Sequence, residues 1–405
     1  MKPIILNGLF FIINLNLLGA VDITPESQAR LTVWISGPVE LAAYSATVAD
    51  FQKLYPGLTI NLEDVPAVDA RARLETRGPA GTGPDVFATP HDQLGDLSAS
   101  GLIMPNLIYS NTVKAGFLDS ALSVLSFEGK LMAFPVSMET LVMLTNKNLF
   151  PQAPATWEDL LSLGRPLTDV AKGHYGFLFP VGDLYVCYPF LATSGAYVFG
   201  NGGRNPEDIG LANAGGVKGL ETMLKLREIS LKNAGDATWD AVQGLFLHGR
   251  VGAILQGPWA MKELSKAGFP LGVAPLPLMA GQRPSTFSGI MVLAVSSYSR
   301  FPKAAQLFAA FATSEKQLCQ HFAKTGQIPP LKAFLQDETL SRDPLVKPFL
   351  DQLQASQPMP NIKEMKYLWV PMAAALRDAW DGKESPRSAL DKALTTIKEQ
   401  ILFSN

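Results

Sequence analysis

Short apolar segments alternate with helical segments early in the chain, and this alternation restricts the possible folds more than any other feature. Strands are predicted at residues 31–35, 58–62 and 86–88, which are short runs dominated by apolar and β-branched side chains. Residues 41–55 and 68–74 between them have helical spacing and end before Pro-Gly or Gly-Pro breaks. A strand–helix–strand–helix–strand order predicts an α/β fold with a parallel sheet and helices on both faces.

The size and charge of the chain narrow the function classes. At 405 residues it exceeds one ordinary domain and suits two. A net charge of -2 provides no field for binding nucleic acid or an anionic membrane, and 47% hydrophobic residues indicate a compact protein. Cys187 and Cys319 are far apart and the four histidines are scattered, so we expect no metal and no cofactor.

The amino terminus has the pattern of an export signal. Lys2 precedes an apolar run that ends with the small residues Gly19 and Ala20. Residues 1–20 are therefore predicted to be a signal peptide cleaved near Ala20, which makes the mature protein exported and soluble. An uncleaved membrane anchor is the alternative, although three asparagines weaken the run as a membrane span.

Polar side chains gather where the predicted strands end. Ser36 follows the strand at 31–35, Asp92 follows the strand at 86–88, and Glu139 ends the segment 133–139. Asp183 and Tyr185 are expected directly before a helix that runs to Gly195. In α/β sheets the crevice beyond the carboxyl ends of the strands is the usual ligand site. Thr156 is instead interpreted as a helix cap.

Aromatic residues occupy similar positions. The apolar run at 252–256 stops at Gly257-Pro258, and Trp259 then heads a helical pattern, which would expose its ring at the end of a strand. Two alternatives stay open at this point. Trp259 could fill the space between strand and helix, and Tyr185 and Tyr188, three residues apart, could share a buried helix face.

These residues together resemble a known family. The sequence is similar, from about residue 31 to residue 397, to the periplasmic maltose- and maltodextrin-binding proteins of ABC import systems. The segments that carry the resemblance are Trp34-Ile35-Ser36-Gly37, Gly83-Pro84-Asp85-Val86, His91-Asp92, Tyr185, Phe246 with Gly249 and Gly252, Gly257-Pro258-Trp259-Ala260 and Met359-Pro360-Asn361-Ile362. The other segments resemble sugar-binding proteins in general, whereas Met359-Pro360-Asn361 followed by Trp369 resembles the maltodextrin-binding proteins in particular.

The resemblance implies a two-lobe periplasmic binding protein fold with a multi-strand hinge and a ligand cleft between the lobes. The amino-terminal lobe would comprise 28–138 plus 290–340 and the carboxy-terminal lobe 139–287 plus 343–403, with crossings near 137–139, 287–289 and 340–343. The implied ligand-binding residues are Ser36, Asp92, Glu139, Asp183, Tyr185, Trp259, Met359 and Trp369. The carboxylates would accept sugar hydroxyls and the aromatic rings would face the pyranose rings. The implied partners are an oligosaccharide and membrane permease subunits, and the protein would act as a monomer.

The sequence also departs from the family pattern. Pro38 and Val39 stand where the family has an acidic-basic pair, and Thr89 stands where it has an aromatic residue. Gln93 and Ala373 each stand where the family has a basic residue. Maltose itself need not be the best ligand, and another α-glucoside, a longer dextrin or a different oligosaccharide stays open. Two other functions are weighed against a sugar binder. Asp92 and Glu139 could be a glycosidase carboxylate pair, or the cleft could bind a solute that is not a sugar.

Overall fold

The computed structural model describes residues 23–403, so the predicted signal peptide at 1–20 lies outside the described residues. The strands are β1 Arg30–Ile35, β2 Thr59–Asp64, β3 Val86–Pro90, β4 Ile103–Met104, β5 Ser126–Phe127, β6 Lys130–Leu131, β7 Phe134–Glu139, β8 Val142–Asn146, β9 Tyr175–Leu178, β10 Val251–Gln256, β11 Leu271–Ala274, β12 Phe287–Ser296 and β13 Gln357–Pro358. The α-helices are α1 Pro38–Leu54, α2 Ala70–Arg77, α3 Leu94–Ala99, α4 Asn111–Gly116, α5 Asp119–Val124, α6 Trp157–Gly164, α7 Leu184–Thr193, α8 Gly200–Gly203, α9 Ala214–Leu224, α10 Trp239–Leu247, α11 Met261–Leu264, α12 Pro302–Ala312, α13 Glu315–Thr325, α14 Lys332–Gln336, α15 Glu338–Ser341, α16 Lys347–Leu353, α17 Trp369–Trp380 and α18 Pro386–Phe403. Short 3₁₀ turns that matter below are η3 His91–Gln93, η8 Pro258–Ala260 and η9 Lys363–Tyr367.

The first sheet has the order β13-β12-β3-β1-β2, and β4 and β7 also pair with β12. β1 is parallel to β2 and β3, which confirms the order predicted for the first three strands. The parallel arrangement does not extend to the whole sheet, because β12 runs antiparallel to both β3 and β7. β12 follows β11 of the other sheet instead of a crossover helix, so nothing forces it to run parallel.

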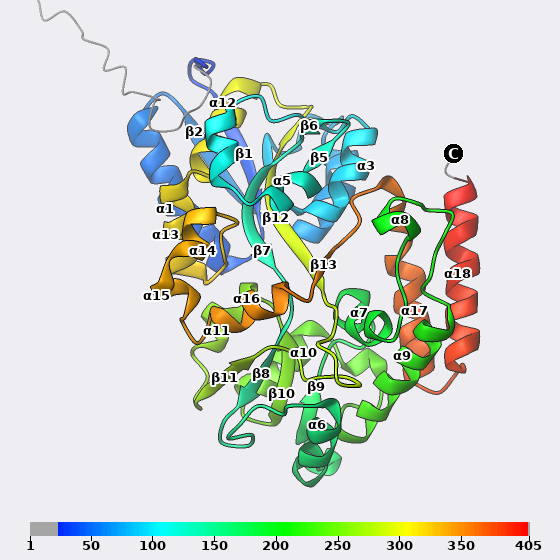
Figure 1. The fold of residues 1–405 in the computed structure, drawn as a ribbon. Helices are drawn as coiled ribbons and strands as arrows, with labels where there is room; N and C mark the ends of the chain where they lie inside the picture. The colour runs from blue at the N-terminus through cyan, green and yellow to red at the C-terminus, as the bar shows by residue number, and fades with distance from the viewer. Residues whose placement is uncertain (1–22, 404–405) are drawn as a thin grey trace, which may run out of the picture.

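The second sheet has the order β11-β8-β10-β9 and forms the lower part of the molecule in Figure 1. The chain passes from the first sheet to the second between β7 and β8 and returns between β11 and β12. Thr140 lies at the first crossing, and its hydroxyl Oγ1 contacts Thr286 Oγ1 at 2.7 Å and the Phe287 carbonyl oxygen at 2.9 Å. Both crossings are thus held against each other by buried hydrogen bonds.

Each sheet is covered by helices that bury large apolar side chains against it. Trp34, Phe87 and Phe308 are fully buried around the first sheet, and Phe177 and Trp380 are fully buried around the second. Figure 1 shows α1 and α12 on the upper sheet and α17 and α18 along the edge of the lower part. This two-lobe α/β arrangement confirms the predicted fold class.

Local signals in the sequence account for several boundaries. α1 begins at Pro38, three residues before the predicted start, because proline suits the first position of a helix, where its missing N–H costs nothing. Thr156 caps α6 as predicted, in a reciprocal capping box with Asp159. Among the helices of residues 23–403, none is long and apolar enough to cross a membrane.

Candidate functional site

Asp92 occupies a buried position just beyond the carboxyl end of β3, in the turn η3. Its residue surface is only 6% exposed, and its Oδ1 atom has no hydrogen-bond partner. Burial raises the Asp92 pKa to about 7, against the opposing effect of hydrogen bonds from its own backbone and from the Trp369 side chain. The structure therefore brings Asp92 and Trp369 into contact and leaves one carboxylate oxygen free to accept a donor.

Glu139 is the last residue of β7, at the point where the chain leaves the first sheet. Burial raises its pKa to about 8, and the negative charges of Glu40 and Asp92 add to the increase. These effects place three carboxylates within electrostatic reach of one another. Sequence reasoning identified Asp92 and Glu139 but missed Glu40, which lies in the first turn of α1, close after the end of β1.

Asp183 is the N-cap of α7, and both of its oxygens accept N–H donors. Oδ1 accepts from the Tyr185 backbone at 2.8 Å, and Oδ2 accepts from Trp239 Nε1 at 2.8 Å. Tyr185 is the second residue of α7, so the expectation that it precedes the helix is wrong by two residues. The side chain of Asp183 replaces the intrahelical carbonyl that the first turn lacks, which is why the helix starts at Leu184.

Aromatic rings form a wall next to these carboxylates, and we call Tyr185, Trp239 and Trp259 the aromatic wall. The Trp259 ring centroid lies 6.1 Å from that of Tyr185 and 5.9 Å from that of Trp239. The Tyr185 hydroxyl has no hydrogen-bond partner. Burial raises the Tyr185 pKa, as do the nearby carboxylates of Glu139, Asp183 and Asp92. The wall and the acidic side chains therefore face the same region.

The sequence left open whether Tyr185, Tyr188 and Trp259 belong to the hydrophobic core, and the structure gives a different answer for Tyr188 than for the other two. Tyr188 is buried and stacks on Phe287 with centroids 3.7 Å apart, so it belongs to the core. Tyr185 also stacks on Phe287, at 6.1 Å, but remains partly exposed. Trp259 packs against the cores of both sheets and keeps part of its ring accessible. Sequence reasoning did not identify Trp239 as a residue of the site. Thr238, which caps α10, could have indicated that Trp239 is the first residue of a helix.

The segment from Met359 to Trp369 reaches the site from the far end of the chain. Met359 is buried, and its carbonyl oxygen accepts from His91 Nε2 at 3.1 Å. His91 Nδ1 accepts from the Ile290 backbone N–H at 3.1 Å, so the ring is neutral with its proton on Nε2, and burial lowers its pKa to about 4. One buried histidine thus connects η3 to β12 and to the segment that carries Met359.

Ser36 and four of the residues that depart from the family pattern, Pro38, Val39, Thr89 and Gln93, lie on the first-sheet side, whereas Ala373 lies in α17. Ser36 follows β1 and is partly exposed. Thr89 donates from its hydroxyl to Gln93 Oε1 at 2.8 Å, and Gln93 donates from Nε2 to the Val68 carbonyl at 2.9 Å. These two uncharged side chains therefore satisfy each other and the backbone. Within residues 23–403, no group of three or more His, Cys, Asp or Glu side chains is arranged to hold a metal ion.

Comparison with known proteins agrees with this geometry. The chain matches the family of bacterial extracellular solute-binding proteins over residues 36–318. It is 32% identical over 363 residues to a galactooligosaccharide-binding protein of Bacillus subtilis, and this match covers 87% of this chain and 85% of that protein. It is 30% identical over 353 residues to the maltodextrin-binding protein MdxE of the same organism, covering 85% of this chain and 84% of that protein.

A solved structure extends the comparison to three dimensions. MalX from Streptococcus pneumoniae, in complex with maltopentaose, superposes with a TM-score of 0.84 at 28% identity, covering 91% of this chain and all of that chain (100%). The family match spans well over half of the sequence, and the relatives cover nearly all of the described fold. The chain belongs to the bacterial extracellular solute-binding protein family.

Proposed function

We propose that this protein is the substrate-binding component of an ABC importer and that it captures oligosaccharides of the maltose and maltodextrin type. The observation that carries the proposal is the pairing of partly exposed aromatic faces with buried acceptors that lack donors. Trp259 presents such a face next to Tyr185, and the Tyr185 hydroxyl and Asp92 Oδ1 both lack hydrogen-bond partners. A sugar offers the complement of this surface, because its ring has apolar C–H patches and its rim has hydroxyl donors.

Each predicted ligand residue receives a role in the proposal. Asp92 and Glu139 accept hydroxyl donors, and Asp183 uses its remaining lone pairs while it holds Tyr185 and Trp239 in place. Tyr185, Trp259 and Trp369 cover sugar rings. Ser36 and Met359 border the bound chain, at the end of β1 and next to β12 respectively.

Capture proceeds by closure of two lobes around the sugar. The lobes are 28–138 plus 290–340 and 139–287 plus 343–403, and the crossings at Thr140 and before β12 act as the hinge. Bound sugar contacts both lobes and shifts the population toward the closed form, which a membrane permease then recognises. The mature protein works as a monomer outside the cytoplasmic membrane, after removal of residues 1–20 near Ala20.

Binding is favoured over hydrolysis and over a solute that is not a sugar. The family and the relatives described above are binding proteins. A glycosidase pair needs one protonated and one ionised carboxyl at neutral pH. The raised pKa values of Asp92 and Glu139 follow first from burial, so they do not by themselves call for a catalytic pair. An amino acid or phosphate ligand would require a cationic side chain facing it, whereas the neighbouring charges that act on Glu139 are negative.

The test is calorimetric titration of ligand-free mature protein with maltotriose, maltotetraose, a galactooligosaccharide and a mixture of amino acids. We expect saturable binding of at least one neutral oligosaccharide and none of the amino acids. The Trp259→Ala variant should lose at least tenfold in affinity because a central aromatic contact is removed, and Trp259→Phe should retain most of it. Folded protein that binds none of these sugars, or Trp259→Ala with wild-type affinity, would contradict the proposal.

A further inference from the structure

Three carboxylates from separate parts of the chain converge at the sugar site. Glu40 comes from the first turn of α1, Asp92 from η3 and Glu139 from the end of β7. The negative charges of Glu40 and Asp92 both act on Glu139, and those of Glu139 and Asp92 also act on the Tyr185 hydroxyl. We call Glu40, Asp92 and Glu139 the acidic trio.

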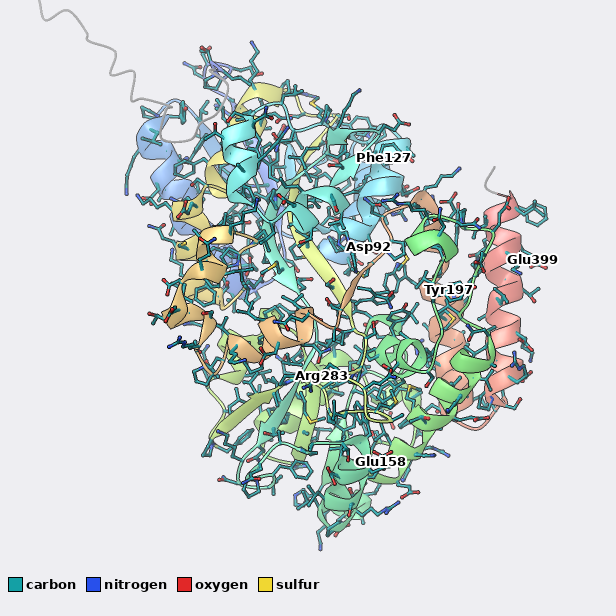
Figure 2. The ribbon with its side chains drawn as sticks, in the orientation of Figure 1. Asp92, Phe127, Glu158, Tyr197, Arg283 and Glu399 are labelled. Carbon is teal, nitrogen blue, oxygen red and sulfur yellow. The ribbon has the colours of Figure 1, made fainter. Side chains whose placement is uncertain are left out.

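An independent feature shows that one member of the trio, Asp92, has an oxygen without a hydrogen-bond donor. Asp92 is more than nine-tenths buried, and its Oδ1 atom has no donor. Figure 2 shows Asp92 in the middle of the molecule, near β12 and the segment that follows β13. The Tyr185 hydroxyl is also unpartnered and lies under the influence of the same charges. A buried carboxylate oxygen without a donor is costly, so this position is suited to a ligand that donates.

Two of the cations on adjoining segments are already paired with another carboxylate. Arg71 of α2 and Lys366 of η9 both bind Asp96, at 2.9 and 2.6 Å. At Glu40, Oε1 accepts from Gln327 Nε2 at 2.8 Å, and Oε2 lies 3.1 Å from the His321 ring nitrogen Nε2. The positions Val39, Gln93 and Ala373, where the family pattern has basic residues, are uncharged here. The charged groups that act on Glu139 are thus Glu40 and Asp92, and both are acidic.

We infer that this site prefers oligosaccharides in which one sugar carries a protonated amine, and that it discriminates against acidic sugars. The inference rests on the proposed function, since it names the ligand class of the same cleft. An ammonium group supplies three N–H donors and a positive charge. One substituent would therefore provide both the missing donor at Asp92 and a charge that offsets the acidic groups. A carboxylated sugar would bring a further negative charge to these acidic groups and would be repelled.

Proton exchange gives the inference a signature that neutral sugars lack. Burial keeps Glu139 and Asp92 largely protonated at pH 6.5, because their pKa values are raised to about 8 and about 7. When a protonated amine enters, one of these carboxyls transfers its proton to solvent and becomes the carboxylate partner of the ammonium. About one proton is released per ligand, whereas a neutral sugar leaves the carboxyls protonated.

The experiment is calorimetry at pH 6.5 in two buffers of different ionisation enthalpy, which together report affinity and proton release. The ligands are maltotriose, maltotriose with a 2-amino group placed in turn on each glucose, the N-acetylated form of each, and a uronic acid trisaccharide. We expect the best amine isomer to bind at least tenfold tighter than maltotriose, which corresponds to about 1.4 kcal/mol. It should release about one proton, and the uronate should bind most weakly.

Variants test the trio through the ratio of amine to maltotriose affinity. Glu139→Gln and Glu40→Gln should lower this ratio, and Glu158→Gln is the matched control, because Glu158 is an exposed residue of α6. Amine isomers that bind no tighter than maltotriose would overturn the inference while the proposed function stands. Binding of amines without binding of maltotriose would support the inference and replace the proposed sugar, and binding of neither would refute both.

Discussion

Replacement of Glu139 by glutamine should stabilise the ligand-free protein, and the gain should grow with pH. The pKa of Glu139 is about 8 in the folded protein, against an ordinary value of 4.5. Because the folded pKa is raised, the folded state holds a proton between pH 4.5 and 8 that the unfolded chain has lost. Wild-type stability is therefore highest below this window and falls as pH rises through it.

The size of the effect follows from the width of the window. Each pH unit within it costs about 1.4 kcal/mol of unfolding free energy, so an increase from pH 5 to pH 8 would cost about 4 kcal/mol at most. Solvent reaches part of the Glu139 side chain, and screening reduces the expected loss to about 2 kcal/mol. Glutamine resembles the protonated acid but does not titrate, so Glu139→Gln should match the wild type at pH 5 and exceed it by about 2 kcal/mol at pH 8.

Urea unfolding followed by circular dichroism at both pH values measures this difference. Asp92 titrates with the same sign, because its pKa is raised to about 7, but it is present in both proteins and contributes to the comparison only through its coupling to Glu139. Glu158→Gln, an exposed substitution, should show no pH-dependent difference. An equal stability difference between Glu139→Gln and wild type at pH 5 and pH 8 would refute the reasoning.

Three further substitutions test contacts that surround the site. Gly95→Ala would place a Cβ atom 1.7 Å from the Asn361 carbonyl oxygen, and we expect it to destabilise the protein by more than about 3 kcal/mol or to displace that segment, measured by urea unfolding and by sugar affinity. Thr156→Ala removes a capping box far from the aromatic wall and should cost about 1 kcal/mol of stability with unchanged sugar affinity. Trp239→Phe keeps an aromatic ring but removes the N–H that binds Asp183, and calorimetry should show sugar affinity reduced several-fold with the fold retained.

The sequence was most informative where local pattern and general sheet geometry agree. The three strands at the start of the chain and the Thr156 cap could be predicted, since each depends on neighbouring residues. The same patterns placed Asp92 and Glu139 at strand ends, and the structure brings these two within electrostatic reach of each other. In α/β folds the ligand site lies beyond the carboxyl ends of the strands, so residues that follow different strands can be assigned to one site from local patterns.

Contacts between distant segments could not be predicted in this way. Glu40 looks like an ordinary acidic residue in the first turn of a helix, and only the folded chain places it near Glu139. Trp239 has the local pattern of a helix start, and its bond to Asp183 depends on how α10 packs near α7. The antiparallel direction of β12 likewise depends on the return of the chain from the second sheet. Each of these features is decided by tertiary packing, which propensity and periodicity do not describe.

The state of Asp92 before ligand arrives bears directly on specificity. One part of its carboxyl group is already engaged by the Trp369 side chain, whereas Oδ1 has no donor. A ligand that only replaced Trp369 would exchange one hydrogen bond for another and gain little net free energy. A ligand that donates to Oδ1 removes the cost of a buried acceptor without a partner, and a charged donor also offsets the repulsion between Asp92 and Glu139. Discrimination among sugars in this cleft should therefore depend on the donor that reaches Oδ1 more than on the number of hydroxyls in the ligand.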